Sequence, residues 1–145
     1  MNLAMTVEER ERFFAGVHVG VLSVTDPGHG PLTVPVWYAY EPGGDVTIQT
    51  GRTSRKGALL RPGERVSLCA QTETAPYQYV SVEGPVVVVE DGVDDAERRS
   101  IAERYLGAEF GALYLEATAD TAVEEVTVRV RPERWWTVDY KKQFA

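Results

Sequence analysis

The sequence predicts a mainly β protein with peripheral helices, in which six or seven antiparallel strands form a small barrel rather than a sandwich. Short valine-rich runs alternate apolar and polar residues, and Pro/Gly turns separate them. Only about three stretches have helical character, and no repeat, low-complexity tract or linker divides the chain. With 145 residues, a single domain over residues 1–145 is the expectation.

The first half of the chain begins with a helix and continues with three strands. Thr6 and Glu9 have the spacing of a capping box, which predicts a helix that ends near Ala15. Valine-rich residues 17–24 are the first strand, and the turn at 26–31 ends it. A hairpin follows, with strands at 33–40 and 45–50 and a turn at 41–45.

The second half mixes strands and helices. Residues 56–60 predict a short helix that stops at Arg61-Pro62-Gly63. Asp94 is the expected N-cap of a helix over 94–106, and Gly107 is its expected stop. The remaining elements are a helical piece at 110–119 and strands at 66–72, at 77–90 with an interruption at Gly84-Pro85, at 123–131 and at 135–140.

Charge and hydropathy exclude several classes of partner. The net charge is −7, from 15 Lys and Arg against 22 Asp and Glu, which opposes nucleic-acid binding. No run approaches the roughly 18 consecutive apolar residues that cross a bilayer. Residues 1–9 lack the basic start and apolar stretch of a secretion signal. We therefore expect a cytoplasmic protein that binds neither nucleic acid nor membrane.

Few side chains offer metal or nucleophile chemistry. Cys69 is the only cysteine, so no intrachain disulfide or thiolate cluster can form, and its apolar strand predicts a small buried side chain. His18 and His29 are the only histidines, and His29 lies in a turn. Neither a metal centre nor a triad hydrolase is expected, and no catalytic side chain is assigned.

The segment from Thr50 to Gly57 is the candidate binding site. Arg52, Arg55 and Lys56 gather where a strand ends and a helix begins, although cations are normally favoured at the other helix end. Backbone N–H groups, hydroxyls and cations together suit a phosphate or carboxylate. The alternative is an ordinary Ser54 N-cap with solvated charges. The spacing matches neither a Walker loop nor a dinucleotide fingerprint.

Four motifs follow one another in order along the chain. They are Val34-Pro35-Val36-Trp37-Tyr38, Gly51-Arg52-x-x-Arg55-Lys56, the Gly84-Pro85 break and Arg131-Pro132-x-Arg134-Trp135-Trp136. Their order and spacing resemble the pyridoxamine phosphate oxidase-like split β-barrel family over roughly residues 8–140. The resemblance implies a six- to seven-stranded split barrel of the FMN-binding type. It also implies a homodimer with two flavin-type cofactors in grooves between the subunits.

Within that family, the chain is most similar to the actinobacterial branch that uses the deazaflavin coenzyme F420. The resemblance implies an F420-dependent oxidoreductase that transfers a hydride between the cofactor and a small conjugated organic substrate. The cofactor carries such chemistry, while the protein binds and orients it. True pyridoxamine phosphate oxidases have a C-terminal Arg-x-His element, whereas Trp135 is followed here by Trp136-Thr137-Val138-Asp139-Tyr140. Oxidation of vitamin B6 is therefore not expected.

The expected cofactor site combines both lines of reasoning. Arg55 and Lys56 are the leading phosphate ligands, and Arg52 reaches either the phosphate or the glutamyl tail. Pro35 lacks an N–H and is expected on an edge strand or at a bulge. The resemblance implies that residues 75–78 approach from the partner subunit. The full set is Val34, Pro35, Val36, Gln49, Thr50, Gly51, Arg52, Ser54, Arg55, Lys56, Ala75, Pro76, Tyr77 and Gln78.

Several alternatives stay open. The same barrel with bound FMN fits the phosphate site equally well, and so does a non-catalytic carrier or sensor of a cofactor or another anionic ligand. Trp37 is interpreted as barrel core and Tyr38 as surface. Trp135, Trp136 and Tyr140 suit either a dimer interface or a wall of the substrate site.

Overall fold

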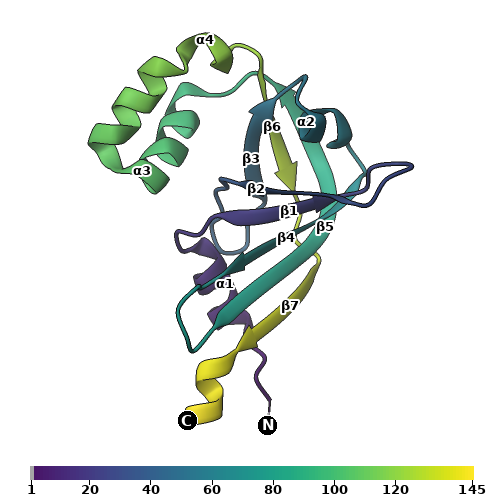
Figure 1. Cartoon of the computed structure of the whole chain (residues 1–145), viewed down its shortest axis with the longest axis vertical. Coiled ribbons are helices and arrows are strands. Elements are labelled where there is room, and N and C mark those ends of the chain that lie inside the picture. Colours follow the sequence, from purple (N-terminus) through teal and green to yellow (C-terminus); the bar gives the residue numbers. More distant parts are fainter. Residues whose placement is uncertain (1) are drawn as a thin grey trace.

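The computed structural model describes residues 2–145, and it contains one seven-stranded sheet that curls into an open barrel (Figure 1). The order across the sheet is β2-β1-β4-β5-β6-β3, and β7 pairs with β5. All of these pairings are antiparallel, which confirms the predicted fold class. The strands are β1 Gly20–Val24, β2 Leu32–Val36, β3 Val46–Gly51, β4 Arg65–Gln71, β5 Gln78–Asp91, β6 Glu125–Val130 and β7 Arg134–Asp139.

The helices lie at the margins of the sheet. They are α1 Val7–Ala15, α2 Arg55–Leu59, α3 Asp95–Ala117, α4 Ala119–Ala122 and the 3-10 helix η1 Tyr140–Phe144. The capping box of Thr6 and Glu9 and the Asp94 cap form as predicted. Gly107 has φ 81° and interrupts α3, so the predicted stop is confirmed. The sequence patterns predicted neither α4 nor η1.

The interior is filled by side chains that alternate along the strands and by Phe14 of α1. Phe14 is fully buried and stacks on Tyr38, with the ring centroids 4.6 Å apart. The interpretation of Trp37 as core and Tyr38 as surface was wrong. Val34, Val36 and Tyr38 share the inward face because successive strand residues point to opposite sides, so Trp37 lies outside the barrel.

Two further predictions need correction. The second strand ends at Val36 rather than at residue 40, and beyond it only an isolated bridge joins Ala39 to Thr47. Cys69 is half-buried, because it points to the outer face of β4 between the inward Leu68 and Ala70. Within residues 2–145, none of the helices combines the length and the apolar character needed to cross a membrane.

The Gly84-Pro85 pair does not interrupt β5, which runs through it from Gln78 to Asp91. The glycine instead permits a close approach of the chain between β6 and β7. A Cβ atom on Gly84 would lie 1.7 Å from the carbonyl oxygen of Arg131. Beside it, the Arg131 N–H donates to the Pro85 carbonyl at 3.0 Å. The crossing therefore requires a residue without a side chain.

We expect Gly84→Ala to lower the free energy of unfolding by about 3 kcal/mol or more, because backbone must move to admit the methyl group. Urea unfolding followed by circular dichroism measures the change. Gly30→Ala is the matched control, since a Cβ there meets nothing within 4 Å. Equal stability of the two variants would contradict the close approach.

Candidate functional site

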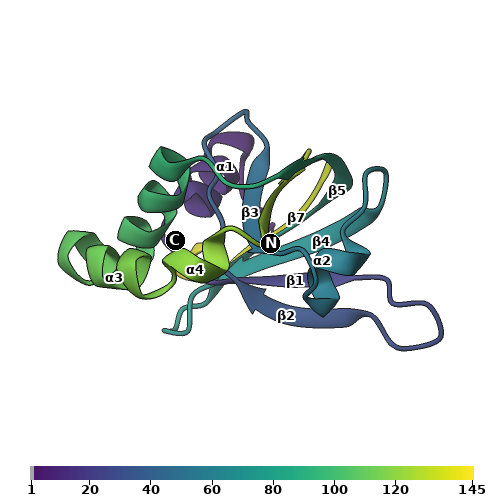
Figure 2. The same ribbon diagram turned by 90° about the horizontal axis from the view of Figure 1, so that it is seen from above.

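The barrel is open between β2 and β3, the two terminal strands of the sheet order (Figure 2). Ala39 and Thr47 exchange backbone hydrogen bonds of 3.0 and 2.9 Å, and beyond that bridge the two strands diverge. Backbone N–H and C=O groups alternate in direction along a strand, so those of Gln49 face the opening as Thr47's do. Pro35 lies on the edge strand β2, as its missing N–H predicted. The opening thus offers backbone groups to a ligand.

A pocket of about 350 Å³ occupies this opening, and we call it the gap pocket. Its walls come from both terminal strands, from α2 and from α3. The lining residues are Val19, Pro35, Val36, Trp37, Gln49, Lys56 and Tyr114. Pro35, Val36, Gln49 and Lys56 belong to the predicted site, and the structure brings them together here.

Two side chains that line the gap pocket carry polar groups without a partner among residues 2–145. The Nε2 atom of Gln49 is buried and makes no hydrogen bond. The ammonium group of Lys56 likewise forms no ion pair or hydrogen bond with any residue of 2–145. A buried amide without a partner is unfavourable, so both groups suit a ligand that carries an acceptor near Gln49 and an anion near Lys56.

The two arginines of the predicted cradle are already paired. Arg55 forms a two-pronged ion pair with Asp26 of the β1–β2 loop, whose carboxylate is buried. Arg52 contacts Asp91 at 3.1 Å and Glu124 at 3.4 Å. The cations that looked anomalous at a helix start therefore have carboxylate partners from distant segments. Lys56 is the cation of this turn that forms no ion pair with a described residue.

The hydroxyls of the cradle are occupied in the same way. Ser54 caps α2, because its Oγ accepts from the Gly57 N–H at 3.1 Å and donates to the Gly51 carbonyl at 2.8 Å. Thr50 is buried, and its hydroxyl lies 3.2 Å from that of Ser54. The Ser54 N-cap of the alternative interpretation is therefore confirmed, whereas its solvated charges are not, since Arg52 and Arg55 are paired. The helix has only five residues, so its N-terminus adds little field of its own.

The remaining predicted residues lie elsewhere. Val34 points inward and packs against the core. Ala75, Pro76 and Tyr77 line a different pocket, of about 410 Å³, with Tyr140, Gln143 and Phe144. Gln78 starts β5 next to it, at the end of the sheet where the chain termini lie, away from α2 (Figure 1). Within one chain, this segment does not meet the gap pocket.

An aromatic cluster from α3 borders the gap pocket, and sequence reasoning missed it. Trp37 stacks on Tyr105 with centroids 5.1 Å apart and contacts Tyr114 at 5.2 Å. The Tyr105 hydroxyl accepts from the Tyr38 N–H at 3.0 Å and also contacts the His18 carbonyl at 2.7 Å. The Tyr105 hydroxyl thus hydrogen-bonds to the backbone just beyond the end of β2. Only the folded contact between α3 and the sheet reveals these residues, because the two are distant in sequence.

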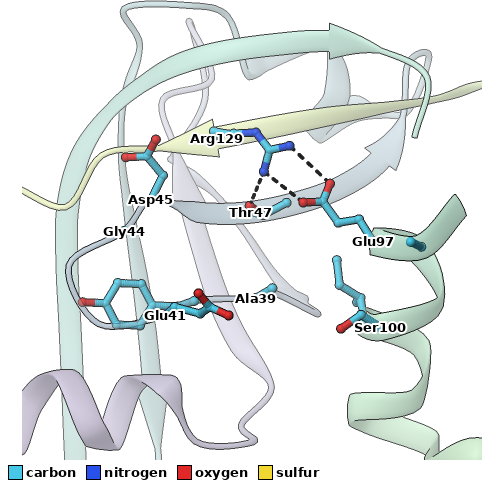
Figure 3. A pocket seen from close by; sticks show the side chains of 11 residues that line it. Ala39, Glu41, Gly44, Asp45, Thr47, Glu97, Ser100 and Arg129 are labelled. Atoms are coloured by element: carbon cyan, nitrogen blue, oxygen red, sulfur yellow. Dashed lines mark hydrogen bonds and ion pairs between the residues drawn. The ribbon is translucent and has the colours of Figure 1, made fainter. Parts of the chain in front are cut away.

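A larger pocket of about 590 Å³ lies beside the first turns of α3 (Figure 3). Arg129 lies between Thr47 and Glu97 there, donating to them at 2.8 and 3.1 Å, and Glu90 also pairs with it. Glu41 and Asp45 also line this pocket, as Figure 3 shows. The single guanidinium is therefore compensated by carboxylates, which makes this pocket unsuitable for an anion.

A comparison with protein families assigns the chain. The model of the pyridoxamine 5′-phosphate oxidase family matches residues 6–139, which is nearly the whole chain. The protein belongs to this family. A comparison with curated proteins found no significant match.

Solved structures with the same fold agree with that assignment. A conserved hypothetical protein from Mycobacterium tuberculosis has a TM-score of 0.74 at 23% identity, over 99% of this chain and 90% of that one. An F420 reductase has a TM-score of 0.62 at 18% identity, over 87% and 94%. A FAD-binding protein from Mesorhizobium loti has a TM-score of 0.62 at 18% identity, over 92% and 94%.

We expect Arg55→Ala and Lys56→Ala to differ in stability although both remove one positive charge. Loss of Arg55 leaves the buried Asp26 carboxylate unpaired, which should lower the free energy of unfolding by about 1–2 kcal/mol. Loss of Lys56 should change it by less than about 0.5 kcal/mol. Urea unfolding at pH 7 measures both. An equal loss in the two variants would show that Asp26 does not depend on Arg55.

Proposed function

We propose that this protein is an oxidoreductase that holds a flavin-type cofactor in the gap pocket. The observation that carries the proposal is the pair of unpartnered groups, Gln49 Nε2 and Lys56, on the wall of a pocket at the open margin of the barrel. Membership of the pyridoxamine 5′-phosphate oxidase family supports the same reaction class. When bound, such a cofactor supplies hydride transfer to or from a small substrate.

The cofactor we propose is the deazaflavin coenzyme F420, and FMN is the alternative. Among the similar solved structures, one is an F420 reductase and another is a FAD-binding protein, so the fold accommodates both types of ring. Both F420 and FMN carry a phosphate on a ribityl chain. The substrate that suits an F420-dependent reductase is a small conjugated organic molecule.

Different residues of the site would contact different parts of the cofactor. Lys56 would contact the phosphate as a compact point charge. Gln49 would donate its free amide N–H to an acceptor on the ring system, which removes the unfavourable buried donor. Pro35 and Val36 would contact the ring through the edge of β2. Arg55 would hold α2 in place through Asp26, and Arg52 remains a candidate for the glutamyl tail of F420.

We further propose that the active form is a homodimer with the cofactor between its subunits. The outer face of β2, β1, β4, β5 and β7 supports this proposal. One row of residues across that face has mostly apolar side chains and no charged ones, and we call it the apolar row. The row follows the strand register through Pro35, Val21, Cys69, Ser81 and Trp136. Directly opposed residues project to the same face. Trp136 is 68% exposed, and an uncovered apolar row of this kind is typical of an interface.

The dimer would also complete the site. Val19 and Pro35 connect the apolar row to the gap pocket, so a second subunit on this face would border the cofactor. Residues 75–78 lie far from the gap pocket of their own chain, and in a homodimer they would approach that of the partner. A cytoplasmic location is proposed with this assembly, since F420 and FMN are intracellular cofactors.

A non-catalytic carrier with the same site is the competing function. It would bind the cofactor but would not consume it. Steady-state oxidation of reduced F420 by a panel of quinones and enones separates the two, because a carrier gives no turnover above the rate without protein.

We expect the purified protein to bind F420 at micromolar concentration, measured by fluorescence polarisation, with FMN tested by its absorption spectrum. Lys56→Ala should weaken binding about tenfold or more, because it removes a charge-assisted contact to phosphate. Arg99→Ala is the matched control, since it removes one exposed cation on α3. Unchanged affinity in Lys56→Ala would move the phosphate elsewhere. Binding of neither cofactor would reject the proposed function.

We expect Trp136→Glu to give a monomer and to weaken cofactor binding, since it buries a charge in the proposed interface. Light scattering during gel filtration measures the mass. Phe110→Glu is the control, because Phe110 is 59% exposed on α3 and lies outside the apolar row. A wild-type protein with the mass of one chain would contradict the dimer.

A further inference from the structure

A small polar cavity lies under α3, next to the gap pocket. Its volume is about 40 Å³, and its walls are Trp37, Gln49, Arg98, Ile101, Ala102, Tyr114 and Glu125. Trp37, Gln49 and Tyr114 also line the gap pocket, so the two cavities adjoin. A cavity of this size with several polar groups can hold a water molecule. Arg98 and Glu125 are its charged residues, and neither of them lines the gap pocket.

Glu125 supplies the carboxylate of this cavity. It starts β6 opposite Gly51, and alternation along the strand puts it on the outer face with Thr127 and Arg129. Its Oε1 lies 3.7 Å from Arg98 Nε, which is an ion-pair contact longer than a hydrogen bond. No residue of 2–145 donates a hydrogen bond to this carboxylate.

The surroundings of Glu125 leave it able to take up a proton. Burial raises the pKa of Glu125, while the charges of Arg98 on α3 and Lys56 on α2 lower it. Glu9 shows the contrary case, since hydrogen bonds from Lys142 and Thr6 lower its pKa to about 2. Tyr114 of α3 is the other titratable group on the cavity wall. The charge of Lys56 thus disfavours the protonated form of Glu125. Lys56 is also the residue beside which the anion would bind.

We propose that Glu125 is the proton source of the site, and that an anion bound beside Lys56 causes Glu125 to take up its proton. This inference rests on the proposed function. A bound phosphate compensates the charge of Lys56 and adds a negative charge of its own, and both effects favour the neutral acid. Ligand binding would therefore be coupled to proton uptake, and binding would strengthen as the pH falls.

The proton completes the proposed reduction. A conjugated double bond that accepts a hydride gains two electrons and one hydrogen, which the reduced cofactor would supply as it is oxidised by two electrons, and the substrate still needs one proton. The O–H bond of Glu125 would break, and a C–H or O–H bond would form on the substrate, with the proton passing through a water in the small cavity. Solvent then returns a proton to the carboxylate, so atoms and charges balance. The same carboxyl would run the reverse reaction by accepting the proton.

The first test needs no ligand. Carboxyl ¹³C resonances of labelled glutamate are followed by NMR against pH, and Glu125→Gln identifies the signal. We expect a pKa above the ordinary value of about 4.3, and a further rise in Lys56→Gln. Glu97→Gln is the matched control, because it removes another glutamate carboxylate, one that pairs with Arg129 on the same face. An ordinary pKa that does not respond to Lys56→Gln would overturn the inference.

The second test measures proton uptake on binding. Titration calorimetry with F420, and then with FMN, in buffers of different ionisation enthalpy gives the protons taken up per ligand. We expect the wild type to take up protons on binding and Glu125→Gln to lose this uptake. We also expect the affinity of the wild type to fall by up to about tenfold for each unit of rising pH, and that of Glu125→Gln not to do so. The difference between the variants removes the titration of the ligand itself.

The outcomes separate the two proposals. Binding without proton uptake would overturn the role of Glu125 and leave the proposed function standing. Binding of neither ligand would reject the proposed function and this inference with it. If Glu125 only held α3 through Arg98, Glu125→Gln and Arg98→Gln would lower stability alike, and the pH dependence of binding would not change.

Discussion

The missing pairing between β2 and β3 is the constraint on which the other features of the site depend. Had the two strands continued beyond the Ala39–Thr47 bridge, they would have closed the barrel and used the edges that now face the gap pocket. Tyr105 of α3 takes part of that role, since its hydroxyl serves the backbone of Tyr38 and its ring stacks on Trp37. The opening is thus kept by packing against α3, and the pocket is a consequence of that packing.

Charge compensation distinguishes the cations around the opening from one another. A buried carboxylate without a partner is costly, and Asp26 and Arg55 satisfy one another across two elements. Arg52 and Arg129 are paired in the same manner, each with two carboxylates. In an acidic protein this leaves Lys56 as a localised positive group beside the buried amide of Gln49. The proposed anion site therefore rests on one cation that lacks an ion pair among the described residues, and not on the number of cations.

Much of the fold followed from local patterns, and the site followed only in part. The capping box at Thr6, the cap at Asp94 and the stop at Gly107 were predictable because each depends on neighbours within a few residues. Pro35 on an edge strand was predictable from its missing N–H. The inward direction of Tyr38 was missed, although its alternation with Val34 and Val36 could have indicated it. The partners of Arg52 and Arg55 could not be inferred, because they lie in segments distant along the chain.

The sequence alone determined the strand-rich architecture, the helix ends and the basic turn after β3, since these depend on alternation, capping groups and turn residues that act over short distances. Only the tertiary structure decided which cations were neutralised, which strands stayed unpaired and which aromatic side chains bordered the opening. Gly84 shows the reason clearly: the sequence marks an irregular position, but the need for glycine comes from the carbonyl of Arg131 in another segment. Electrostatic pairing and close packing depend on distances through space, and these exist only once the chain has folded.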